Sequence, residues 1–196
     1  MAEKILPARL LYPESEIRER LSSLAYLIAP DYEKSDTSLV VTAVMKGGAP
    51  VAITLMQELS RLGLSTEFDF VHVSTYQDQQ KVQFPRLVSG PTEIPTGDHV
   101  LLVDEIVDTG TTTHFLERVY KAYKCASVAM VTLIARTSTK ERLPKLRMAI
   151  EYDQSDWLVG WGLDAGGKGR ELPDIYAIPP GSSLVYVDGQ PHYKRD

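Results

Sequence analysis

The chain has 196 residues, of which 43% are hydrophobic and 24% are charged, a composition typical of one globular domain that buries its own core. The formal net charge of -5 argues against a broad surface for nucleic acid, although a local phosphate site needs no overall positive charge. No apolar run approaches a membrane span, the first residues lack a secretory signal, and the single cysteine, Cys125, excludes an intramolecular disulfide. We therefore expect a cytoplasmic protein with neither a membrane nor a nucleic acid among its partners.

The N-terminal part of the chain predicts a helix, then a strand, a turn and a second helix. Apolar residues recur at helical spacing over residues 13–28, where a proline opens the first turn. Residues 39–45 form an apolar run that predicts a strand, and a lysine with two glycines makes a turn at residues 46–48. Helical spacing returns over residues 51–62 and stops at a glycine.

The middle of the chain changes character before the strand–turn–helix pattern returns. Residues 73–97 are polar and rich in proline and glycine, and we interpret them as a mobile excursion from the sheet. An apolar strand over residues 99–103 then runs into acidic residues and a Gly/Thr turn, and a helix over residues 115–123 follows. Later apolar runs predict four more strands, at residues 127–134, 148–150, 158–159 and 175–178.

Continuous apolar runs, rather than alternating ones, are typical of parallel strands buried on both faces. The sequence therefore predicts an α/β fold with a central, mostly parallel sheet flanked by helices. We find no internal repeat and no interdomain linker, so residues 1–196 are taken as a single domain.

Residues 108–112 have the chemistry of a phosphate-binding loop. A loop that leads into a helix offers unpaired backbone N–H groups to an anion. Gly110 lets the backbone curl closely around a phosphate, and the hydroxyls of Thr109, Thr111 and Thr112 add donors beside the amides. Such a loop suits a terminal phosphomonoester.

Three carboxylates lie beside this loop. Asp104 and Glu105 follow an apolar strand, where charged groups are costly unless they find partners such as sugar hydroxyls or Mg²⁺. Asp108 stands at the entrance of the loop and is the candidate for proton transfer near the bound sugar phosphate.

Residues 103–112 resemble the phosphoribosyl-pyrophosphate signature of type I phosphoribosyltransferases, in which two acids and two aliphatics precede Asp-Thr-Gly-x-Thr. The resemblance implies that fold, with a flexible loop and a small hood built from the terminal segments. It implies that 5-phosphoribosyl 1-pyrophosphate is one substrate and that Mg²⁺ is the cofactor. By position, Asp104 and Glu105 would hold the ribose hydroxyls directly or through Mg²⁺, Asp108 to Thr112 would bind the 5-phosphate, and Asp108 would face the purine N7 as general base or acid.

Two further segments are similar to the hypoxanthine–guanine members of this family. Lys46 and Gly47 match their pyrophosphate loop, which often has an unusual peptide geometry, although Lys-Gly-Gly alone also fits an ordinary turn. In the segment 157–173, Trp157 would stack on the purine, the Leu158 backbone would read its exocyclic group, Asp164 would bind Mg²⁺ and Arg170 would contact pyrophosphate. Trp157 alone equally fits a core aromatic.

The resemblance also assigns Ile106 and Arg136 to the purine pocket. The lysine that relatives use for the purine 6-oxo group is matched by Ala135, and Arg136 replaces it only if the strand bulges, because adjacent strand residues point to opposite faces. Ser74, Thr75 and Tyr76 resemble the start of the flexible loop that closes over the site, although a plain exposed hairpin fits the same composition.

We therefore predict a purine salvage enzyme that converts hypoxanthine or guanine with 5-phosphoribosyl 1-pyrophosphate to IMP or GMP and pyrophosphate. Relatives of this size form dimers or tetramers, so we expect a homodimer or homotetramer. One alternative is a phosphoribosyltransferase that prefers xanthine or another base, which Ala135 keeps open. The other is a non-catalytic regulator that senses phosphoribosyl pyrophosphate, although 26 acidic against 21 basic residues leave no evident basic face.

Overall fold

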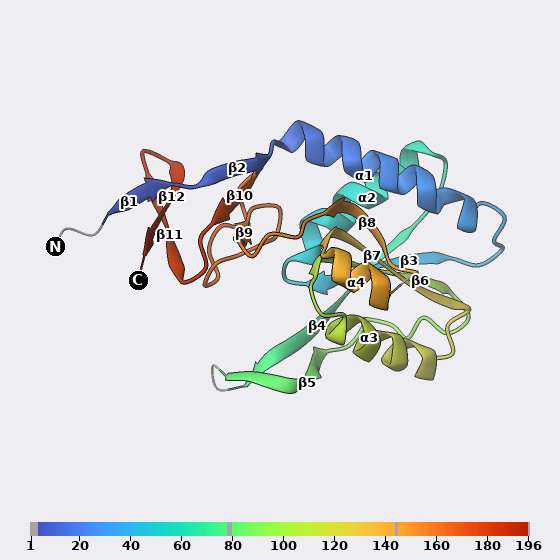
Figure 1. Cartoon of the computed structure of the whole chain (residues 1–196). Coiled ribbons are helices and arrows are strands. Elements are labelled where there is room, and N and C mark those ends of the chain that lie inside the picture. The colour runs from blue at the N-terminus through green and yellow to red at the C-terminus, as the bar shows by residue number, and fades with distance from the viewer. Residues whose placement is uncertain (1–3, 78–79, 144, 196) are drawn as a thin grey trace.

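A six-stranded sheet forms the centre of the computed structural model, which describes residues 4–77, 80–143 and 145–195, without the side chains of residues 75–84, 140 and 141. The strand order is β5-β4-β3-β6-β7-β8, and all neighbours are parallel except β4 and β5 (Figure 1). The strands are β3 (Leu39–Met45), β4 (Glu67–Gln77), β5 (Gln80–Ser89), β6 (His99–Val107), β7 (Ser127–Ala135) and β8 (Arg147–Glu151).

Helices cover both faces of this sheet, as the sequence predicts. Figure 1 shows α1 (Glu14–Ile28) and α2 (Gly48–Arg61) on one face and α3 (Thr111–Ala122) on the other. A short 3-10 helix (Ala29–Asp31) follows α1, and α4 (Thr137–Arg142) follows β7. None of the helices in the described ranges is both long and apolar enough to cross a membrane.

The central strand β6 shows why the buried strands have uninterrupted apolar sequences. Leu101 and Val103 pack in the cluster beneath α1 and α2, whereas Val100 and Leu102 pack in the cluster beneath α3. Alternate residues of a strand face opposite sides of the sheet, and because helices cover both sides, all of these residues must be apolar. Burying each such side chain contributes about 1.5–3 kcal/mol to folding.

Two predicted boundaries were wrong. The strand expected over residues 99–103 continues to Val107, because Asp104, Ile106 and Val107 still pair with β7. Most of the segment 73–97, expected to leave the sheet, instead extends it: β5, residues 80–89, pairs antiparallel with β4 and forms the edge of the sheet, whereas residues 90–97 lie outside it. Its polar residues hid the strands, since an edge hairpin needs little apolar surface.

The terminal segments form the small hood that the resemblance implies. One three-stranded sheet has the order β1-β12-β11 and a second has the order β2-β10-β9, so each joins N-terminal to C-terminal strands. Figure 1 shows both sheets to one side of the central sheet, where the first strand, β1, pairs with the last, β12. The strands are β1 (Ile5–Pro7), β2 (Arg9–Tyr12), β9 (Trp157–Val159), β10 (Ile175–Ile178), β11 (Ser182–Val187) and β12 (Gln190–Arg195).

Candidate functional site

The predicted phosphate loop connects β6 to α3 at the carboxyl end of the parallel strands. Gly110 caps α3 with a left-handed backbone (φ 77°), and a Cβ added there would lie 2.8 Å from Leu143 Cδ1. The hydroxyls of Thr109 and Thr111 lie 3.0 Å apart on the exposed side of the loop. The first N–H groups of a helix have no partner within it, so amides and hydroxyls converge where an anion would bind.

The acidic pair lies on β6 itself, at the edge of the core. Asp104 is only 8% exposed, and its carboxylate accepts a hydrogen bond of 3.0 Å from the Glu105 backbone N–H. Burial raises the pKa of Asp104 well above its usual range, and the neighbouring Glu105 carboxylate raises it further. This carboxyl group therefore lacks full charge compensation within the protein.

Arg170 joins two of the predicted acids. Its Nη1 atom lies 3.6 Å from Glu105 Oε1, and its Nη2 atom lies 2.5 Å from Asp164 Oδ1. Three residues predicted from distant segments of the sequence thus meet at one point. Among the residues in the described ranges, no group of three or more His, Cys, Asp or Glu is arranged to hold a metal ion. The assignment of Asp104, Glu105 and Asp164 to Mg²⁺ stays a prediction.

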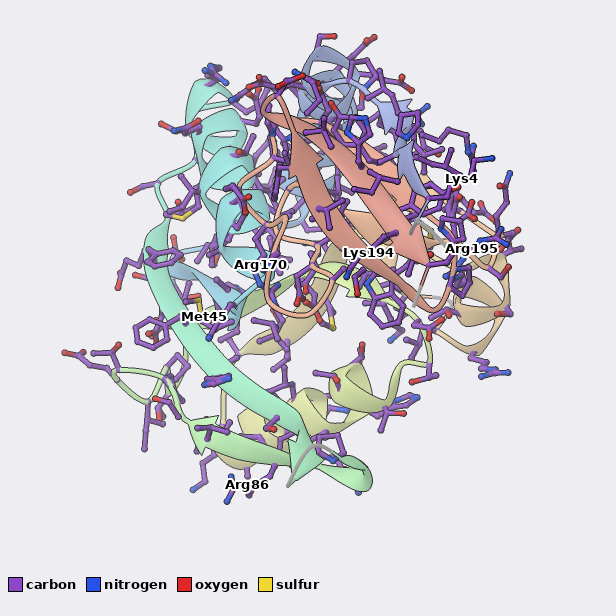
Figure 2. The ribbon with its side chains drawn as sticks, turned by 90° about the vertical axis from the view of Figure 1, so that its left-hand side faces the viewer. Lys4, Met45, Arg86, Arg170, Lys194 and Arg195 are labelled. Carbon is purple, nitrogen blue, oxygen red and sulfur yellow. The ribbon has the colours of Figure 1, made fainter. Side chains whose placement is uncertain are left out.

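The predicted pyrophosphate loop packs against this cluster. The Met45–Lys46 peptide bond is cis, the kind of unusual geometry that the resemblance implies. A Cβ added at Gly47 would lie 2.0 Å from Glu105 Cδ, and one at Gly162 would lie 2.0 Å from the Gly47 carbonyl oxygen. Figure 2 shows Arg170 on the loop beside α2, close to Met45 at the end of β3. Only glycine permits these close approaches of loop to loop.

Arg136 contacts Asp108, and no bulge in β7 is needed for this contact. Its Nε atom lies 3.5 Å from Asp108 Oδ1. Arg136 follows the last residue of β7 with an extended backbone (φ -79°, ψ 145°), and it lies over Tyr152 of the cluster beneath α1 and α2, on the face opposite Ala135, as strand alternation predicts. Ala135 is fully buried in the core beneath α3. The cationic side chain beside Asp108 is therefore that of Arg136.

The predicted purine-binding residues divide between the core and the surface. Trp157 is 50% exposed, so its interpretation as a core aromatic was wrong, and its Nε1 donates to the Asp164 carbonyl oxygen over 2.6 Å. Leu158 is buried and Ile106 is half-buried in the cluster beneath α1 and α2. An indole fixed at its edge and open on a face can stack on a planar ligand.

The predicted flexible loop begins on β4. Ser74 is half-buried, and the side chains of Thr75 and Tyr76 lie outside the described residues. Their role stays a prediction.

Several residues of the site carry no signal in the sequence. The Thr139 hydroxyl donates to the backbone carbonyl of Asp108, and the carbonyls of Tyr152 and Gln154 accept from Arg136 Nη1. A threonine in a short helix is not a recognisable motif, and a backbone carbonyl can belong to any residue type, so the sequence does not single out these positions. Only the packing of α4 and the segment after β8 against the phosphate loop identifies them.

Comparisons with known proteins find a matching family and similar named proteins. A family model described as a phosphoribosyl transferase domain matches residues 15–165. The bifunctional protein TilS/HprT of Listeria innocua is 29% identical over 182 residues, covering 88% of this chain and 26% of that protein. The chain thus spans about a quarter of the length of these bifunctional relatives. Hypoxanthine-guanine phosphoribosyltransferase of Bacillus subtilis is 25% identical, covering 88% of this chain and 93% of that protein.

Solved structures share the fold. The hypoxanthine phosphoribosyltransferase of Trypanosoma cruzi, in complex with the product IMP, has a TM-score of 0.77 and 26% identity. The superposition covers 92% of this chain and 98% of that one. The fold expected from the sequence is confirmed.

Proposed function

Because the chain belongs to the phosphoribosyl transferase domain family, we propose that it transfers phosphoribose from 5-phosphoribosyl 1-pyrophosphate to hypoxanthine or guanine. The products would be IMP or GMP and pyrophosphate. The B. subtilis relative, whose name states this activity, supports the proposal because the alignment covers 93% of it. The observation that supports the proposal best is the phosphate loop itself, with Asp108 at its entrance and with the buried Asp104 and the half-buried Glu105 just before it on β6.

The 5-phosphate would bind at the start of α3. Backbone amides from Asp108 to Thr112 and the hydroxyls of Thr109 and Thr111 are donors, and the positive end of the helix favours an anion. Because the site uses backbone groups, a chain with a net charge of -5 can still bind a phosphomonoester.

The ribose and the pyrophosphate would bind over the acid cluster. Asp104 and Glu105 would accept hydrogen bonds from the ribose hydroxyls, and Lys46, Gly47 and Arg170 would contact the pyrophosphate. We assign Mg²⁺ to Asp104, Glu105 and Asp164 because their carboxylate oxygens are the kind of ligand that this ion takes, and Glu105 and Asp164 both contact Arg170. When bound, Mg²⁺ would offset the charge of the pyrophosphate leaving group.

The reaction would proceed by displacement at the anomeric carbon. The bond from this carbon to the pyrophosphate oxygen breaks with its electron pair leaving on pyrophosphate, and the purine N9 forms the new bond. The purine then carries one proton too many, which Asp108 would accept from N7. Carboxylates around the site would stabilise the positive charge that develops on the sugar ring.

The base would lie between Ile106 and Trp157, with the Leu158 backbone at its edge. Arg136, beside Asp108, would supply the donor for the 6-oxo group in place of the lysine expected from the family. Arginine stays protonated and holds its donors in a planar fork, so it suits a carbonyl oxygen. Competition among hypoxanthine, guanine and xanthine in one assay measures the preferred base.

The test of this function is Asp108→Asn with nucleotide formation followed from phosphoribosyl pyrophosphate. We expect kcat to fall about 10²- to 10⁴-fold, the usual worth of general acid–base catalysis, with little change in sugar-phosphate affinity. Asp188→Asn, at an exposed acid between β11 and β12, is the matched control. Unchanged turnover in the Asp108 variant would remove Asp108 from proton transfer.

We also propose a homodimer or homotetramer in the cytoplasm. The C-terminal region of a T. cruzi relative has been studied for its role in oligomeric state and activity. Light scattering on the purified chain would give the subunit number, and a monomer at micromolar concentration would contradict the proposal.

A further inference from the structure

The position of Arg136 depends on the segment that connects β8 to β9. Its Nη1 atom donates to the Tyr152 carbonyl over 3.3 Å and also to the Gln154 carbonyl. The Tyr152 ring lies beneath the guanidinium, 5.7 Å from its carbon atom. The Asp108 carboxylate contacts the same guanidinium at Nε, so the planar group is held between Asp108 and this segment.

That segment is in turn fixed by an arginine of the hood. The Arg9 Nη2 atom, on β2, lies 2.6 Å from Asp156 Oδ2 and 3.1 Å from Gln154 Oε1. The same Asp156 oxygen accepts a hydrogen bond of 2.7 Å from the Tyr152 hydroxyl. Arg9 of the N-terminal segment thus contacts two residues of the segment that holds Arg136.

The Tyr152 hydroxyl is a dependable donor in this network. Burial, followed by the hydrogen bond to Asp156, raises the pKa of Tyr152 to about 12. The hydroxyl therefore stays protonated throughout the pH range of an assay, and the contact to Asp156 does not change with pH through Tyr152.

We propose that Arg9, Asp156 and Tyr152 are positioning residues that hold Arg136 beside Asp108 and so set the recognition of the exocyclic oxygen of the base. This inference rests on the proposed function, because it assigns Arg136 to the base. Arg9 lies on a different sheet from the phosphate loop and acts on Arg136 through the segment that contains Gln154 and Asp156.

The contacts of Arg9, Asp156 and Tyr152 affect the position of Arg136 more than the stability of the fold. Half of the Arg9 side chain is exposed (54%), and an exposed ion pair contributes little to folding. A donor displaced by a fraction of an ångström, however, no longer aligns with the acceptor on a bound ligand. Loss of the network should therefore weaken binding of an oxygen-bearing base while leaving the sugar phosphate unaffected.

The experiment compares Arg9→Met and Tyr152→Phe with wild type. Methionine keeps the apolar stem of Arg9, and phenylalanine keeps the ring beneath Arg136, so both variants should fold. We expect KM for hypoxanthine to rise on the order of tenfold, with KM for phosphoribosyl pyrophosphate and kcat within about twofold. Arg61→Met, which removes another exposed ion pair, on α2, is the control and should leave all constants unchanged.

A double-mutant cycle separates positioning from a general structural effect. In an Arg136→Met background, Arg9→Met should have no further effect on KM for hypoxanthine, because the group it positions is gone. An additive effect in that background, or an unchanged KM in both single variants, would overturn the proposal. If wild type forms no nucleotide from any purine, the proposed function itself fails, which is a different outcome.

Discussion

Replacing Gly110 by alanine tests the geometry of the phosphate loop. A left-handed backbone costs a non-glycine residue roughly 1–2 kcal/mol. The added Cβ would lie 2.8 Å from Leu143 Cδ1, and pushing that side chain from its rotamer costs about 0.5–1.5 kcal/mol more. We expect a loss of about 1.5–3.5 kcal/mol in the free energy of unfolding, which for a chain of this size lowers Tm by roughly 3–14 °C.

Thermal and urea unfolding of Gly110→Ala measure this loss, and Gly97→Ala is the matched control. Gly97 is also left-handed (φ 86°), but an added Cβ would meet nothing within 4 Å. The difference between the two variants therefore isolates the contact with Leu143. In a Leu143→Ala background, Gly110→Ala should cost no more than Gly97→Ala does. Equal losses for the two glycine variants in the wild-type background would refute the close contact, and no loss at Gly110 would refute its left-handed backbone.

Three further predictions concern the site and its support. Gly47→Ala should lower kcat/KM for phosphoribosyl pyrophosphate at least about tenfold, because the new Cβ displaces the Glu105 carboxylate; steady-state kinetics with wild-type values would contradict this. Trp157→Ala should raise KM for hypoxanthine roughly 5- to 150-fold, the kinetic equivalent of about 1–3 kcal/mol of stacking, with Trp157→Phe in between. Hydrogen bonds from the hydroxyl and the N–H of Thr137 lower the pKa of Asp153 in the folded protein. The ionised Asp153 carboxylate therefore stabilises the fold at pH values above the pKa of an unperturbed aspartate, and this stabilisation is lost as the pH falls through the lowered pKa of the folded state. Asp153→Asn should therefore lower Tm at pH 7 but not at about pH 2, and an equal effect at both would exclude the ionised carboxylate as the cause.

The sequence predicted the parts whose signal is local. Parallel strands buried on both faces need unbroken apolar runs, so β3, β6 and β7 could be read directly. The phosphate loop could be read as well, because a strand, a glycine and a helix start follow one another in the chain. The family resemblance, based on residues 103–112 and 157–173, is confirmed by the family match.

Pairing between distant segments was not predictable in the same way. The polar strands β4 and β5 and the hood strands β1, β2, β11 and β12 exist because a neighbour accepts their hydrogen bonds, and such pairing leaves little pattern in the sequence. The apolar hood strands β9 and β10, in contrast, were predicted.

The contacts of two arginines show most clearly what the sequence predicts and what only tertiary packing decides. Arg170 was assigned by resemblance, but only the packed loops bring it between Glu105 and Asp164. Strand alternation predicted that Arg136 lies on the face opposite Ala135, and it does, over Tyr152 of the cluster beneath α1 and α2. Only the tertiary structure shows that Arg136 on this face lies 3.5 Å from Asp108. Local sequence determined which residues could do the chemistry, and long-range packing decided which of them meet, because the contacts of a side chain depend on segments that are distant in the sequence.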